Sequence, residues 1–131
     1  MRNKFLGTGT AGYHPLRKAR VVLSGLRYAV AYDFSVAWKV VVSVVLLAMA
    51  AVLHQWLDVI TILAATGLML SLEPMNSAIE ALCNFVEARD NWKIGVIKDI
   101  AAAAAAVGIA VWAIVLVVES SRLWEHLGSS A

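Results

Sequence analysis

The side chains best suited to chemistry lie in one short run of the sequence, LEPMNSAIE at residues 72–80. Glu73, Asn76 and Glu80 are spaced i, i+3, i+7, so on an α-helix they line one face. Acids in a membrane helix are costly, roughly 2.5–3.5 kcal/mol for a central Asp on insertion scales. Such groups could simply hold helices together through hydrogen bonds. We favour a functional role, because two neighbouring acids repel each other unless a cation or a proton lies between them.

Charged residues elsewhere could complete a phosphoryl-transfer site around that face. Asp33 precedes the first apolar segment, and Lys98 and Asp99 precede the third. Asp33 with Glu80 could hold Mg²⁺, a hard cation that binds one or two carboxylates together with phosphate oxygens. Lys98 could pair with phosphates, and Glu73 could accept the proton of a lipid hydroxyl. Each residue also has a simpler explanation; the Lys98–Asp99 pair, for example, could cap a helix.

The composition predicts that these residues are surrounded by lipid. The chain has 131 residues, enough for one domain, and is 61% hydrophobic and 15% charged with a mean hydropathy of +0.77. Soluble domains carry about 25% charged residues. A net charge of +2 is too small to indicate nucleic acid as a partner. The N-terminal segment lacks the apolar region of a cleavable signal peptide, so the spans themselves are expected to direct insertion. The single cysteine, Cys83, excludes an internal disulfide and is interpreted as a core residue.

The chain is expected to begin with a flexible tail over residues 1–15, which is rich in glycine and threonine. Residues 16–32 alternate cations with apolar side chains, which predicts an amphipathic helix at the membrane surface or an extension of the first span. Membrane spans are expected over about residues 34–56, 59–85 and 99–119. Together with the surface helix they make one domain, residues 16–131. Lys39, inside the first span, is expected to extend toward the lipid headgroups.

The distribution of Lys and Arg predicts the orientation. Seven of the 11 lie between Arg2 and Lys39, and three lie between the second and third spans, whereas the first connection has none. The positive-inside rule therefore predicts a cytoplasmic N-terminus and an extracytoplasmic C-terminus. These patterns together predict an all-α, multi-pass membrane protein.

Three features resemble the small prokaryotic diacylglycerol kinase family, which also includes undecaprenol kinases. They are the ExxNSAIE run of residues 73–80, the Lys98–Asp99 pair that opens an alanine-rich third span, and the GLRYA segment of residues 25–29 before an acid. The resemblance covers about residues 16–118. It implies a homotrimer of three-span protomers in a bacterial inner membrane, with active sites between protomers. It also implies Mg²⁺-dependent transfer of the γ-phosphate of ATP to a lipid hydroxyl, and no Walker motif is present in this sequence.

The resemblance also implies roles for individual residues, carried over by position. The expected site residues are Glu73 as catalytic base, Asn76 as a substrate-positioning amide, Asp33 and Glu80 as Mg²⁺ ligands, and Lys98, Asp99, Arg17 and Lys18 as ATP contacts. The acceptor lipid would enter from the bilayer, so that only its hydroxyl needs to reach the base.

The chain departs from the family pattern at several positions. Asp33 replaces the usual Glu and reaches one methylene less far, and Asn84 stands where an acid is usual. Pro74 follows the expected base and removes a helical hydrogen bond, which could kink the helix and redirect the base. Segments 36–39 and 88–91 also differ from the pattern, and they affect the side where the nucleotide is expected.

Three functions remain open from the sequence. The leading hypothesis is an ATP-dependent lipid kinase with direct in-line transfer, for which diacylglycerol is the favoured acceptor and undecaprenol the second. The alternative is a non-catalytic scaffold or accessory subunit that keeps the fold, which Pro74 and Asn84 favour. An ion or proton pathway along the acidic face ranks last, because three spans are few for a transporter. ATP turnover with either lipid distinguishes the first hypothesis from the second.

Overall fold

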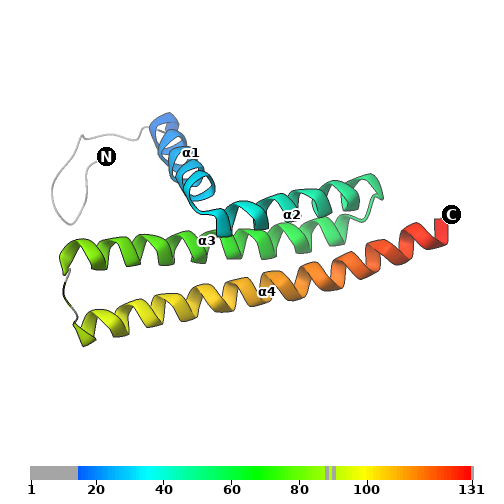
Figure 1. The fold of residues 1–131 in the computed structure, drawn as a ribbon. Coiled ribbons are helices and arrows are strands. Elements are labelled where there is room, and N and C mark those ends of the chain that lie inside the picture. Colours follow the sequence, from blue (N-terminus) through cyan, green and yellow to red (C-terminus); the bar gives the residue numbers. More distant parts are fainter. Residues whose placement is uncertain (1–14, 88, 90, 131) are drawn as a thin grey trace. The chain divides into compact units, whose positions relative to one another are not determined.

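The computed structural model describes residues 15–87, 89 and 91–130, and the regular structure within them is entirely helical (Figure 1). The helices are α1 (Pro15–Tyr32), α2 (Phe34–Val52), α3 (Trp56–Val86) and α4 (Trp92–Ser130). The predicted all-α fold is confirmed. The tail predicted for residues 1–15 lies, except for Pro15, outside the described residues. The chain forms two compact units, the first ending at Phe34 with α1 and the second beginning at Ser35 with α2 to α4.

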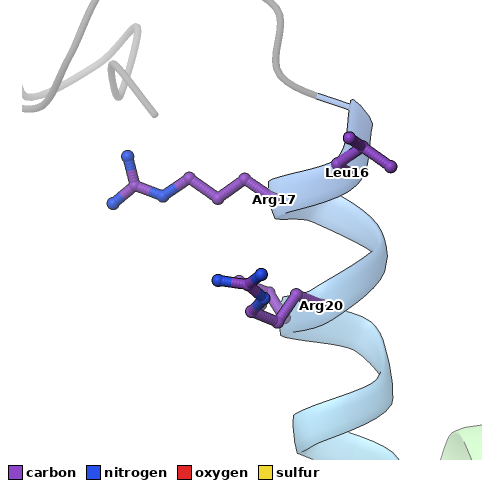
Figure 2. A pocket seen from close by; sticks show the side chains of 4 residues that line it. Leu16, Arg17 and Arg20 are labelled. Carbon is purple, nitrogen blue, oxygen red and sulfur yellow. The ribbon is translucent and has the colours of Figure 1, made fainter.

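α1 has the pattern of an amphipathic helix, and none of its residues is buried. Arg17 and Arg20 extend to one side of the helix and Leu16 to another (Figure 2). These three side chains and Val21 line a shallow hollow. Cations on one side and exposed apolar side chains elsewhere suit a helix at a membrane surface, and that location stays a prediction.

α2, α3 and α4 are each long and apolar enough to cross a membrane. α2 has 19 residues and measures about 28 Å at ~1.5 Å per residue, close to the ~30 Å of a hydrocarbon core. α3 has 31 residues and measures about 46 Å by the same rise. α3, and the still longer α4, therefore exceed the length that the hydrocarbon core alone requires.

The helix ends differ from the expected spans for local reasons. α2 ends at Val52 rather than near residue 56, and the chain turns at His54, whose φ of 57° is left-handed. α4 begins at Trp92 rather than near residue 99. The side chain of Asn91 accepts a hydrogen bond from the backbone N–H of Lys93 at 3.0 Å, so Asn91 caps the helix before the apolar run begins.

α3 and α4 run antiparallel and side by side along most of their length (Figure 1). Their buried residues recur every three or four positions, which is the period of one helix face. The buried stripes are Asp58, Ile62, Ala65, Met69 and Glu73 on α3, and Ala101, Ala105, Gly108, Trp112, Leu116, Glu119 and Leu123 on α4. The charged members of both stripes thus face the protein, as expected for ionisable groups in membrane helices.

Gly108 lies where α4 packs tightly against Leu72 of α3. A Cβ atom at this position would lie 2.8 Å from Cδ1 and 3.4 Å from Cβ of Leu72. Small residues at such crossings allow two backbones to approach closely.

Gly108→Leu is therefore expected to destabilise the hairpin by about 2 kcal/mol, the usual cost of overpacking a core. Gly67→Leu is the matched control, because a Cβ at Gly67 has no neighbour within 4 Å. Unfolding in mixed detergent micelles measures both. Equal stabilities of the two variants would contradict close packing at Gly108.

Candidate functional site

Glu73, the expected catalytic base, lies on the buried face of α3 and is paired with two side chains of α2. Its Oε1 accepts hydrogen bonds from the Ser35 hydroxyl and the Lys39 ammonium, each at 2.7 Å. Lys39 also donates to the Ser35 oxygen at 2.7 Å. Ser35 and Lys39 are four residues apart on α2, so they share a face. Lys39 is 4% exposed and Glu73 7% exposed, so the ring of these three side chains holds two buried charges that compensate each other, while Ser35 lies at its exposed edge.

The prediction that Lys39 extends toward the headgroups is wrong. Its ammonium turns inward and forms an ion pair with Glu73 at 2.7 Å. A buried carboxylate without a partner is strongly unfavourable, so a nearby ammonium is drawn to it rather than to the bilayer surface. The charge of Glu73 is therefore compensated within the chain itself.

The ion pair is also connected to α4. The Ser43 hydroxyl donates to the backbone oxygen of Lys39 at 2.9 Å, and it accepts a hydrogen bond from the indole N–H of Trp112 at 2.8 Å. Trp112 in turn packs edge-on against Trp38, with ring centroids 5.6 Å apart. These contacts join three helices at one level of the bundle.

The same contacts determine how far α2 covers the hairpin of α3 and α4. Ser35, in the first turn of α2, lies level with Glu73, and Ala50, near its other end, packs in one core cluster with Ile62. α2 therefore lies beside the first half of α3 (Figure 1). The second half of α3, with Asn76 and Glu80, projects beyond the start of α2.

Asn76 and Glu80 continue the polar face one and two turns after Glu73. Nδ2 of Asn76 donates to Oε1 of Glu80 at 3.3 Å. Oε2 of Glu73 and Oδ1 of Asn76 are both buried and have no hydrogen-bond partner. Buried acceptors are nearly always paired, so these two oxygens are suited to a hydroxyl group or a cation.

Pro74 does not interrupt α3. The helix runs from Trp56 to Val86 with Pro74 inside it. The Glu73 side chain stays on the buried face of the helix. The backbone oxygen of Glu73 accepts a hydrogen bond from the Ser77 hydroxyl at 3.4 Å.

Lys98 lies near the start of α4 and donates to Oδ1 of Asn84 on α3 at 2.9 Å. Asn84 is neutral, so this contact fixes the ammonium without compensating its charge. Asp99, the next residue, is exposed. Lys98 and Asp99 thus belong to the same end of the hairpin as Glu80, and their role as nucleotide contacts stays a prediction.

Arg17, Lys18 and Asp33 belong to the first unit. Arg17 and Lys18 are exposed on α1, and Asp33 is half-buried, with its backbone N–H donating to the oxygen of Ala29 at 3.3 Å. The pairing of Asp33 with Glu80 as metal ligands stays a prediction.

The residues around Glu80 fit Mg²⁺ by their chemistry. In the described part of the chain, no group of three or more His, Cys, Asp or Glu side chains is arranged to hold a metal ion. Mg²⁺ needs no such group, since one or two carboxylates and the substrate phosphates usually hold it. The Glu80 carboxylate, which accepts a hydrogen bond from Nδ2 of Asn76 at 3.3 Å, is an oxygen ligand of this kind.

A second buried charged cluster, which the sequence analysis missed, lies at the opposite end of α3. Asp58 is fully buried, and its Oδ1 lies 3.2 Å from Nη1 of Arg122, although not in hydrogen-bond geometry. The same Nη1 donates to Oε2 of Glu119 at 3.3 Å. Arg122 could have indicated this cluster from the sequence. It is the only Lys or Arg after Lys98, and it follows Glu119 by three positions, which places the two side chains on one helix face. Lys39 was missed as a partner of Glu73 because the two lie on different helices.

A family model described as prokaryotic diacylglycerol kinase matches residues 20–119. The matched range contains the expected site residues Asp33, Glu73, Asn76, Glu80, Lys98 and Asp99, whereas Arg17 and Lys18 precede it. No curated protein and no solved structure matches the chain.

Proposed function

Because this chain belongs to the prokaryotic diacylglycerol kinase family, we propose that it is an ATP- and Mg²⁺-dependent lipid kinase. It transfers the γ-phosphate of ATP to the hydroxyl of a membrane lipid. Diacylglycerol is the favoured acceptor and undecaprenol the second, since both present one hydroxyl at the end of long apolar chains. As in the family that it resembles, the protein works as a homotrimer in a bacterial inner membrane, with its N-terminus in the cytoplasm and its C-terminus outside.

The observation that carries this proposal is the polar face of α3. Glu73 and Asn76 each keep one buried acceptor oxygen without a partner, and Glu80 follows one turn after Asn76. A carboxylate oxygen shielded from water is suited to take a proton from a lipid hydroxyl. Asn76 would orient the same hydroxyl or the phosphate beside it.

The level of Glu73 in the bundle supports the same proposal. The ion pair with Lys39 lies in the first turns of α2, and α2 is about as long as a hydrocarbon core is thick. We therefore infer that Glu73 lies near one boundary of that core. A lipid hydroxyl and a nucleotide phosphate, which come from different solvents, can meet at such a boundary.

The proposed reaction is a direct in-line transfer of the γ-phosphate. The acceptor oxygen forms a bond to the γ-phosphorus, the bond from that phosphorus to the bridging oxygen breaks, and ADP leaves while the hydroxyl proton passes to Glu73. Glu80, with Asp33, would hold Mg²⁺, which neutralises charge on the phosphate oxygens. Lys98 would pair with the phosphates, and Asp99, Arg17 and Lys18 complete the proposed ATP contacts.

The direct test incubates the purified protein with γ-labelled ATP and Mg²⁺ in mixed micelles that contain either diacylglycerol or undecaprenol. Labelled phospholipid is expected with at least one acceptor, and the ratio of the two rates identifies the preferred lipid. Absence of label with both acceptors would refute the proposed function.

Glu80→Gln is expected to raise the Mg²⁺ concentration needed for half-maximal activity by about tenfold or more, because one carboxylate ligand is lost. A titration of Mg²⁺ at constant free ATP measures this change. Glu125→Gln is the matched control, since Glu125 is exposed near the far end of α4. An unchanged titration curve for Glu80→Gln would remove Glu80 from the ligand set.

A second candidate function is a non-catalytic membrane scaffold with the same fold. The observation in its favour is the compensation of the Glu73 charge by Lys39 at 2.7 Å, because a carboxylate already paired with a cation is a weaker base. The same labelling assay decides between the two functions, since a scaffold transfers no phosphate to either lipid.

A further inference from the structure

The two oxygens of Glu73 differ in their surroundings. Oε1 accepts two hydrogen bonds, from Ser35 and from Lys39, each at 2.7 Å. Oε2 is buried and accepts none. A carboxylate oxygen has about two lone-pair sites, so the two donors saturate Oε1 and leave Oε2 as the oxygen that can still accept a proton.

The donors around Oε1 also restrict the rotation of the carboxylate. Lys39 bonds both Glu73 and Ser35, and Ser35 bonds Glu73, so each member of the ring is held by the other two. The ring is anchored further, because the backbone oxygen of Lys39 accepts the Ser43 hydroxyl, which is bonded to Trp112. A carboxylate held at one oxygen in this way presents its other oxygen in one direction.

We propose that Lys39, assisted by Ser35, is a positioning residue for the kinase reaction: it holds Oε1 of Glu73 so that Oε2 receives the proton of the acceptor hydroxyl. This inference rests on the proposed function. It assigns a role in the reaction to a lysine that the sequence analysis had placed at the bilayer surface. Because Oε2 has almost no solvent-accessible surface, water does not reach it, and the side chains that cover it must move slightly to admit the lipid hydroxyl.

The role of Lys39 is tested by kinetics. Lys39→Met keeps the length and apolar stem of the side chain but removes the ammonium. It is expected to lower kcat about 10- to 100-fold, the range that a misplaced general base costs, and to leave KM for ATP within about twofold. Ser35→Ala removes only the neutral donor and is expected to lower kcat less, in the same direction. The controls are Lys93→Met and Ser71→Ala. Both wild-type side chains are exposed; Lys93 lies near the Trp92 ring and Ser71 donates to the backbone oxygen of Gly67, each on its own helix.

The ion pair is tested separately, in a way that does not require activity. Thermal unfolding is compared for wild type, Lys39→Met, Glu73→Gln and the double variant. Each single substitution leaves one buried charge without its partner and is expected to lower the midpoint temperature, whereas the double variant regains most of the loss.

The possible results separate this inference from the proposed function. Additive losses of midpoint temperature would overturn the ion pair itself. A kcat within twofold of wild type in both Lys39→Met and Ser35→Ala would overturn the positioning role while the kinase function stands. If Lys39→Met does not fold, the kcat of Ser35→Ala alone tests the positioning role, because this variant removes no charge. A wild-type protein that phosphorylates no lipid would overturn the proposed function and the positioning role with it, even if the coupling in the unfolding experiment is present.

Discussion

Glu73→Gln is expected to lower the rate of lipid phosphorylation by about 1,000-fold, within the range that general base catalysis contributes. The glutamine amide has nearly the same shape as the carboxylate but does not accept the hydroxyl proton. The measurement is the initial rate of labelled phospholipid formation at saturating ATP and lipid. More than about a tenth of the wild-type rate would refute the assignment of Glu73 as the base.

The structure requires a control for this experiment, because Glu73 also compensates the buried charge of Lys39. Glu73→Gln is therefore expected to lose stability together with activity. In the double variant Lys39→Met/Glu73→Gln the unpaired charge is gone, so stability returns while activity stays absent. This combination shows that the loss of activity comes from the missing base and not from unfolding. Glu125→Gln, an exposed substitution of the same kind, should change neither property.

Arg122→Gln is expected to destabilise the protein by about 3 kcal/mol, the lower end of the cost of breaking a buried ion pair. Removal of the guanidinium leaves Asp58 and Glu119 as two buried carboxylates without the cation that pairs with both of them. The lower end of the range applies because the Arg122 side chain is 47% exposed and water screens part of its charge. Unfolding with increasing SDS in mixed micelles measures the change.

The matched control for this prediction is Arg89→Gln. The Arg89 side chain is 90% exposed, and its pair with Glu87 lies at the surface, so its loss should change stability by less than about 0.5 kcal/mol. A second test removes one acid together with the arginine: Asp58→Asn with Arg122→Gln should recover part of the stability. Equal effects of Arg122→Gln and Arg89→Gln would contradict a stabilising role for the Asp58 cluster.

The sequence alone determined the class of the protein, its helices and the helix face that carries its intramembrane acids. Long apolar runs predict spanning helices because, in lipid, the backbone N–H and C=O groups must form their hydrogen bonds within the segment itself. The spacing of Glu73, Asn76 and Glu80 predicts a shared face because helical periodicity is a local property. The sequence also contains a signal for the start of α4, since Asn91 is a favourable N-cap residue. The span predicted from residue 99 follows the uncharged run, which begins later than the helix does.

The tertiary structure alone decided the partners of the buried charges. Lys39 and Glu73 are 34 positions apart, and Asp58 and Arg122 lie on different helices. Sequence spacing determines which residues share a face of one helix, but it contains no information on the level at which one helix packs against another. That level is set by side-chain packing, such as Leu72 against Gly108 and Trp112 against Ser43. This packing places the Lys39 ammonium of α2 beside the Glu73 carboxylate of α3, so the lysine forms an ion pair there and does not extend to the headgroups of the bilayer.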